Sequence, residues 1–176
     1  PPVEGYLKAL RKLCSEEKVL LIFDEVITGF RVAFGGAQEL FGIKADITCL
    51  GKIIGGGLPL AALGGRADIM DMLAPAGPVY QAGTLSGNPL ATAAANETLS
   101  LLKNKGVYKK LEKLSARLEI GIRLAAKNNN VPITINRVGS IMSIFFTDRP
   151  VRNFTEVKAC DIARFKKFFA SMLEHG

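Results

Sequence analysis

Two apolar runs, each ending at charged residues, constrain the fold of this chain more than any other feature. Residues 19–23 (VLLIF) form a continuous apolar run that ends in two carboxylates, the first of which is Asp24. A run without polar alternation is typical of a strand buried on both faces of a parallel sheet. A second stretch, residues 46–50, ends just before Lys52. Because ligands of such sheets bind beyond the carboxyl ends of the strands, Asp24 and Lys52 are candidate site residues.

The rest of the chain alternates strand-like and helix-like segments, a pattern that indicates an α/β fold. Gly106 is expected to stop a helix, and after residue 130 the pattern changes to an α+β arrangement. The opening PP and the final helix look cut, which predicts a fragment of a larger enzyme. We therefore predict residues 1–105 as part of a large domain with a mostly parallel sheet, 106–130 as a long connecting helix, and 131–176 as a partial small C-terminal domain.

Composition and cysteine usage exclude several classes of protein. Of 176 residues, 48% are hydrophobic and 22% are charged, as in ordinary globular domains. No apolar stretch reaches the roughly 18 residues that a membrane-spanning helix needs, and the N-terminus lacks the layout of a signal peptide. Three dispersed cysteines and one histidine argue against a zinc site and a disulfide framework. We expect a cytoplasmic protein, or one of the plastid stroma in a plant or alga.

The net charge of +7 raises the alternative of a non-catalytic basic binding protein. The basic residues concentrate between Lys103 and Lys127, where they alternate with leucines at helical spacing. Tyr108 is the one aromatic residue among them, so stacking on nucleic-acid bases has little support. A solvated helix face is the simpler interpretation, and we expect no nucleic-acid partner and no membrane partner.

The surroundings of Lys52 favour a catalytic role over that of a solvated surface charge. A lysine in a partly desolvated site can form an imine with an aldehyde, and pyridoxal phosphate is the commonest such aldehyde in enzymes. Sites for pyridoxal phosphate pair this lysine with an aspartate on the pyridine nitrogen, a role that Asp24 could take. Capping of a turn is the alternative for Asp24, and Glu25 is expected to be structural or hydrogen-bonding. Val26 could pack on the cofactor ring or belong to the core.

Glycines mark two further features. The glycines at residues 55–57 let backbone approach a bound group closely, and they do not form a Walker phosphate loop because they follow the lysine rather than precede it. Residues 83–89 (GTLSGNP) combine backbone amides, two hydroxyls and a helix start, which together suit an anion. Thr84 or Ser86 could bind a cofactor phosphate there, although helix capping explains Ser86 equally well.

Three segments resemble a known family. Residues 21–31 (LIFDEVITGFR) and 42–57 (GIKADITCLGKIIGGG) are similar to the signature of the class III aminotransferases, which depend on pyridoxal phosphate and have fold type I. The spacing from Asp24 to Lys52 agrees with that signature. Residues 64–91 (GGRADIMDMLAPAGPVYQAGTLSGNPLA) resemble more narrowly the aminomutases of this family, which act on glutamate 1-semialdehyde. The likeness covers essentially the whole chain.

The resemblance implies a fold, a reaction and roles for five residues. The fold would be part of a fold type I large domain followed by the start of an α+β small domain. The reaction would be intramolecular amino transfer from glutamate 1-semialdehyde to 5-aminolevulinate, with pyridoxal phosphate and its pyridoxamine form. Lys52 would bind the cofactor and shuttle a proton, Asp24 would hold the ring nitrogen and Val26 would pack on the ring. Gly83 and Thr84 would bind the phosphate of the neighbouring subunit's cofactor in a homodimer.

Two alternatives stay open beside this interpretation. One is an ω-amino-acid or ornithine-type aminotransferase of the same family, against which the loop at residues 81–89 argues. The other is a truncated chain without activity of its own. The family's N-terminal half supplies the ring-stacking aromatic residue, a second phosphate turn, the arginine for the substrate carboxylate and a mobile gate, and this chain contains none of them. Leu60 and Leu63 depart from the family pattern, and we attach no function to them.

Overall fold

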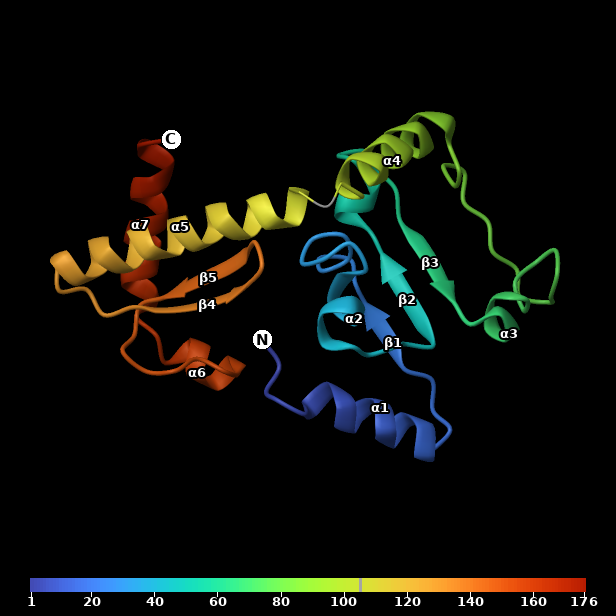
Figure 1. The fold of residues 1–176 in the computed structure, drawn as a ribbon, viewed down its shortest axis with the longest axis horizontal. Coiled ribbons are helices and arrows are strands. Elements are labelled where there is room, and N and C mark those ends of the chain that lie inside the picture. Colours follow the sequence, from blue (N-terminus) through green and yellow to red (C-terminus); the bar gives the residue numbers. More distant parts are fainter. Residues whose placement is uncertain (105) are drawn as a thin grey trace. The chain divides into compact units, whose positions relative to one another are not determined.

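The chain forms two compact units in a computed structural model that describes residues 1–104 and 106–176 (Figure 1). One unit comprises residues 3–108, and the other comprises residues 109–176 with the first two prolines. The predicted domain boundary at residue 105 lies outside the described residues. The assignment of the three predicted segments to domains of an enzyme stays a prediction.

A three-stranded sheet forms the centre of the first unit, in the order β1–β2–β3. β1 (Ile22–Asp24) and β2 (Ile47–Leu50) are parallel, which confirms the predicted α/β class. β3 (Ala62–Gly65) is antiparallel to β2. A parallel return needs a crossover of about a dozen residues or more, usually a helix. Only the short helix η1 (Lys52–Gly55) lies between β2 and β3, so the chain turns back and the sheet is mixed.

Helices surround this sheet (Figure 1). α1 (Tyr6–Glu16) precedes β1, and α2 (Gly36–Phe41) lies between β1 and β2 in the chain. α3 (Ala67–Met70) follows β3, and α4 (Pro89–Leu102) packs against η1. Asn88, directly before Pro89, caps α4: its side-chain oxygen accepts a hydrogen bond from the Ala91 amide at 2.9 Å.

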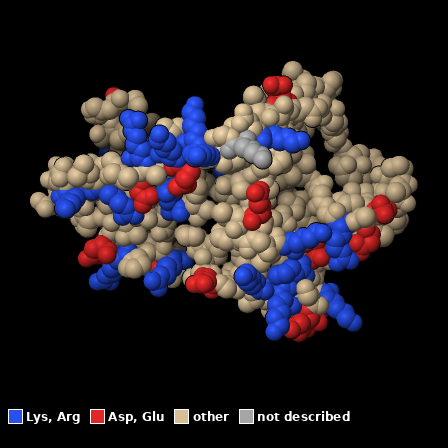
Figure 2. Space-filling view, in the orientation of Figure 1, with Lys and Arg blue, Asp and Glu red and all other residues tan. Residues whose placement is uncertain are grey.

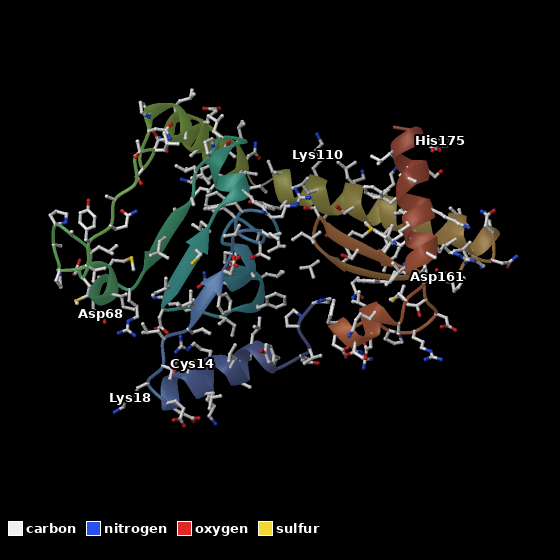
Figure 3. All side chains as sticks on the ribbon, turned by 180° about the vertical axis from the view of Figure 1, so that it is seen from behind. Cys14, Lys18, Asp68, Lys110, Asp161 and His175 are labelled. Carbon is white, nitrogen blue, oxygen red and sulfur yellow. The ribbon has the colours of Figure 1, made fainter. Side chains whose placement is uncertain are left out.

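Asp46 joins the amino ends of β1 and β2 to the carboxyl end of β3, at the opposite end of β2 from Lys52. Its carboxylate accepts hydrogen bonds from the Leu21 amide at 2.8 Å, from Arg11 at 2.7 Å and from Arg66 at 3.1 Å. The Leu21 amide first, and then the Arg11 guanidinium, hold the pKa of Asp46 well below its usual range. Figure 3 shows Cys14, Lys18 and Asp68 beside this end of the sheet, away from η1.

The second unit combines an antiparallel hairpin with helices, the α+β character expected from the sequence. It contains most of α5 (Gly106–Asn128), the hairpin of β4 (Thr134–Val138) and β5 (Ile141–Phe145), α6 (Phe154–Lys158) and α7 (Ile162–Glu174). Arg137 on β4 joins the hairpin to α5 through ion pairs with Glu112 at 2.8 Å and Glu119 at 2.7 Å. An apolar groove of about 680 Å³ is lined by α5, the hairpin and α7.

Figure 2 shows Lys and Arg side chains gathered along α5, with acidic side chains among them. Arg123 of α5 and Arg137 of β4 both form ion pairs with Glu119. Among the residues that the structure describes, no helix is both long and apolar enough to cross a membrane.

Two local predictions differ from the structure. The strand predicted at residues 19–23 begins only at Ile22, and the side chains of Val19, Leu20 and Ile22 are 57%, 46% and 56% exposed rather than buried. Val19 and Leu20 lie before β1, and the side chain of Ile22 projects from a face of the sheet that the described residues do not fully cover. Gly106, expected to stop a helix, instead begins α5, since α4 already ends at Leu102.

Candidate active site

Asp24 and Lys52 lie at the carboxyl ends of neighbouring parallel strands. Asp24 is the last residue of β1 and is paired in register with Cys49 of β2. The Glu25 amide extends this ladder by donating to the Cys49 carbonyl at 2.9 Å. Two residues beyond β2, Lys52 opens η1, and the side chains of both Asp24 and Lys52 are exposed. The structure therefore brings both residues to one edge of the sheet.

Val26 connects these two strand ends. Its amide donates to the Asp24 carboxylate at 3.0 Å, which orients that side chain. Its Cγ1 lies only 3.2 Å from the position that a Cβ on Gly51 would occupy. A side chain at residue 51 would therefore press against Val26, and glycine lets the two strand ends approach. Asp24, Val26 and Lys52, which the sequence singled out separately, form one local cluster.

The backbone of Lys52 has an unusual conformation. Its φ is 46°, in the left-handed region that favours glycine, although it carries a long side chain. Such a conformation costs on the order of 1 kcal/mol and is found preferentially at functional sites. Lys52 forms no ion pair among the interactions of the described residues. The lysine is thus held by its backbone, with its ammonium group available.

One of the glycines that follow Lys52, Gly56, permits close packing of a helix in this structure. Gly56 has a φ of 59°, and a Cβ there would collide with the side-chain oxygen of Thr98 and lie 3.0 Å from the Ala94 carbonyl. Both neighbours belong to α4. The expectation that glycine permits close approach is therefore met for Gly56 by a helix, and approach of a bound group to these residues stays a prediction.

Gly83 and Thr84 lie in an exposed segment that the structure does not bring to Lys52. In Figure 1 the chain from α3 to α4 runs apart from the carboxyl ends of β1 and β2. Gly83 and Thr84 are exposed, and the Gly83 carbonyl accepts a hydrogen bond from the Ser86 amide at 2.9 Å. Asn88, not Ser86, caps the following helix, so the capping explanation for Ser86 is wrong. The phosphate-binding role of this segment stays a prediction.

Two further side chains that contact the strands or α2 were not predicted as part of the site. Glu25 is 1% exposed and caps α2, which confirms its expected hydrogen-bonding character. Gln38 on α2 reaches back to β2. Local patterns do not indicate α2, because the residue that caps it lies 12 positions upstream of the Ala37 amide rather than next to the helix. Among the described residues, no group of three or more His, Cys, Asp or Glu side chains is arranged to hold a metal ion.

Known proteins of one family are similar to this chain in sequence. The model of the family described as "Aminotransferase class-III" matches residues 1–176. Among curated proteins, a glutamate-1-semialdehyde 2,1-aminomutase 2 of Brevibacillus brevis is 55% identical over 176 residues, and a glutamate-1-semialdehyde 2,1-aminomutase of Myxococcus xanthus is 55% identical over 175 residues. The alignments cover 100% and 99% of this chain but 41% of each relative, so the chain spans about two fifths of their length.

Solved structures have the same fold over most of the chain. An ω-transaminase from Sphaerobacter thermophilus matches with a TM-score of 0.80 and 32% identity, covering 89% of this chain and 38% of that one. A glutamate-1-semialdehyde aminomutase from Pseudomonas aeruginosa (K286A), in complex with PMP, matches with a TM-score of 0.77 and 29% identity, covering 89% and 37%. The fold is therefore that of the class III transferases, which are pyridoxal-phosphate enzymes.

Proposed function

Because the chain belongs to the class-III aminotransferase family, we propose that the enzyme carrying it transfers an amino group within one substrate, converting glutamate 1-semialdehyde to 5-aminolevulinate. The observation that carries this proposal is the 55% identity, over essentially the whole chain, to curated aminomutases with that substrate in their names. The reaction is formally an isomerisation and supplies 5-aminolevulinate for tetrapyrrole synthesis.

The residues at the carboxyl edge fit pyridoxal phosphate and its pyridoxamine form. Asp24 offers a carboxylate whose one oxygen is already oriented by the Val26 amide, and Lys52 offers an ammonium group on a strained backbone. An anion beside a cationic ring nitrogen and an amine beside an aldehyde are the pair of contacts that this cofactor needs. When bound, pyridoxal phosphate supplies an electron-withdrawing ring that stabilises negative charge on the substrate carbon.

In the proposed reaction each residue of the cluster has one task. Lys52 would hold the cofactor through its side-chain amine, and the same amine would carry a proton to and from the substrate carbon. Asp24 keeps the ring nitrogen protonated, because an ionised carboxylate favours the charged form of its partner. Val26 would pack against the ring and exclude water from it. The half-buried packing of Val26 against Gly51 supports this assignment.

Gly83 and Thr84 complete the proposed site from a neighbouring subunit. Their amides and hydroxyl suit a phosphate, and their exposure leaves them available to another chain. We propose a homodimer in which each subunit contributes Lys52 to its own site and Thr84 to its partner's site. The separation of the two segments within one chain supports this arrangement.

A reducing compartment, the cytosol or a plastid stroma, is part of the proposal. Cys14, Cys49 and Cys160 are all free thiols in the structure, as such a compartment would keep them.

An ω-amino-acid or ornithine-type aminotransferase is the second candidate, favoured by the good structural match to an ω-transaminase. The two activities differ in what they consume. An aminomutase forms 5-aminolevulinate from glutamate 1-semialdehyde alone, whereas an aminotransferase needs an amino donor and an oxo-acid acceptor. The test is product formation by the purified holoenzyme with and without 2-oxoglutarate or pyruvate. We expect 5-aminolevulinate without either acid, and an absolute requirement for an acceptor would contradict the proposal.

A further inference from the structure

Glu25 is a buried acid with no cationic partner among the ion pairs of the described residues. A buried carboxylate is costly unless hydrogen bonds replace its hydration. Here the Thr28 hydroxyl donates to Oε2 at 2.5 Å and the Ala37 amide donates to the same oxygen at 2.8 Å. The Gln38 amide donates to Oε1 at 2.9 Å. Both carboxylate oxygens of Glu25 therefore accept hydrogen bonds from the first turn of α2.

The chain around Glu25 is built to allow this contact. Gly36 has a φ of 68°, and a Cβ there would collide with the Glu25 carboxylate. A Cβ on Gly29 would lie 2.7 Å from the Glu25 carbonyl oxygen and 2.6 Å from Cδ2 of Leu50, the last residue of β2. Two glycines thus let the segment between β1 and α2 close tightly over the strand ends.

Gln38 connects α2 to β2 by hydrogen bonds. Its side-chain amide donates to the Thr48 hydroxyl at 2.9 Å, and its side-chain oxygen accepts from the Ala45 amide at 2.8 Å. Thr48 lies in the middle of β2 and is in register with Phe23 of β1. Hydrogen bonds therefore run from the end of β1, through Glu25, α2 and Gln38, into the strand that leads to Lys52.

We propose that Glu25 is a positioning residue of the active site. By holding α2 against β2, it fixes the ends of the two strands and sets Asp24 and Lys52 at the separation that the cofactor requires. Glu25 touches neither substrate nor cofactor in this role, and the inference rests on the proposed function. Glu25 lies directly between Asp24 and Val26 in the chain, and the Val26 amide orients the Asp24 carboxylate. A shift of Glu25 would therefore move both of these neighbours.

The chemistry requires a carboxylate at residue 25. The Ala37 and Gln38 amides are donors that approach different oxygens. An isosteric amide, Glu25→Gln, has only one oxygen, so its NH₂ group would face one backbone N–H and leave that donor without a partner. Loss of one such bond to a charged acceptor changes an equilibrium by roughly tenfold or more.

The test compares Glu25→Gln in the holoenzyme with Arg137→Gln, a control that breaks the ion pairs of the second unit and leaves the strand ends intact. In the holoenzyme, the dissociation constant of pyridoxal phosphate and the pH midpoint of its visible absorbance are measured. After the cofactor is removed, hydrogen exchange is measured at residues 35–41 and 45–56. In Glu25→Gln we expect a dissociation constant about tenfold higher, a shifted midpoint and faster exchange in both segments. Arg137→Gln should match the wild type in each.

A folded Glu25→Gln enzyme with faster exchange at residues 35–41 but an unchanged dissociation constant and midpoint would make Glu25 merely structural and overturn the inference. If Glu25→Gln does not fold, Gln38→Ala cuts the same path at its other end and must give the same altered absorbance and affinity; a wild-type result there overturns the inference. Failure of the proposed function looks different, because the wild type itself would then leave Lys52 unlabelled after pyridoxal phosphate and borohydride. In that case, faster exchange at residues 45–56 in Glu25→Gln than in the wild type would still support the hydrogen-bond connection from Glu25 to β2. Unchanged exchange there would refute it.

Discussion

The carboxyl edge of β1 and β2 and the segment of residues 74–88 contribute differently to the proposed site. At the edge, contacts within the chain determine the geometry: Val26 orients Asp24 and packs on Gly51, and Glu25 anchors α2. In the segment, Gly83 and Thr84 are exposed and lie apart from Lys52. The half of the proposed site at the carboxyl edge is therefore organised before any ligand or partner binds. The half at residues 83–84 depends on contacts with a cofactor or a neighbouring subunit. Mutations in the two regions should differ in how much activity they remove and in whether a second subunit can restore that activity.

The largest effect is expected at the organised edge, from Lys52→Ala. Removing the amine removes both the attachment of the cofactor and the proton transfer at the substrate carbon, and the latter alone contributes roughly 10²–10⁴-fold to a rate. We expect turnover to fall by at least that factor while the fold is kept. Steady-state formation of 5-aminolevulinate measures the loss, and Lys44→Ala serves as a control with an exposed lysine on the same chain. Comparable losses in both variants would argue against a special role for Lys52.

Asp24→Asn should have the next largest effect. A neutral amide cannot keep the ring nitrogen protonated, and losing one charge-assisted hydrogen bond costs about 2–3 kcal/mol in cofactor binding, with a further loss in the rate. The pyridoxal phosphate dissociation constant and turnover number of the purified variant measure the two effects. Near wild-type turnover in a correctly folded Asp24→Asn enzyme would remove the electron-withdrawing role from the account.

Thr84→Val should have a smaller effect, and one that depends on the partner. Loss of one hydroxyl from a phosphate contact costs about 1–2 kcal/mol, so the variant alone should be weak but not inactive. Mixing it with Lys52→Ala under conditions of subunit exchange tests the proposed crossing. If Thr84 acts across the interface, each mixed dimer has one site with both defects and one intact site, and activity rises on mixing. No gain over the separately assayed variants would place Thr84 within its own chain.

The smallest effect concerns stability at the amino ends of the strands. The pKa of Asp46 is lowered in the folded chain, so its contribution is complete above the unfolded value of about 3.9 and is lost as the pH falls toward the lower folded pKa. Asp46→Asn should therefore flatten the acid side of the stability curve below roughly pH 4. Urea unfolding between pH 3 and pH 7 measures this, with the exposed Asp71→Asn as the matched control. An unchanged acid dependence in Asp46→Asn would show that its ion pairs contribute nothing to stability.

The organised edge was also the more predictable region. An apolar run that ends at Asp24 and another that ends before Lys52 are local patterns, and parallel pairing of the two strands follows from the α/β alternation. The cap of α4 at Asn88 is an equally local feature, because a capping residue stands directly before a proline there. These features need only neighbouring residues, so the sequence reveals them.

Long-range features could not be read in the same way. The cap of α2 comes from Glu25, and Arg11, Asp46 and Arg66 form ion pairs beside the amino ends of β1 and β2. Partners this far apart in sequence have no local signature, because only the fold brings them together. The exposure of Val19 and Ile22 was missed for a related reason: burial depends on what packs on the faces of the sheet, and an apolar run does not specify that.

The central claim is that Lys52 carries the cofactor, and one measurement tests it most directly. The holoenzyme is reduced with borohydride, digested and mapped by mass spectrometry for the lysine that bears the pyridoxyl group. The account predicts a single labelled lysine, Lys52, in the peptide that follows β2, with Asp24→Asn labelled at the same residue but less completely. A label on Lys44, on Lys18 or on any other lysine, with Lys52 unmodified, would contradict the account.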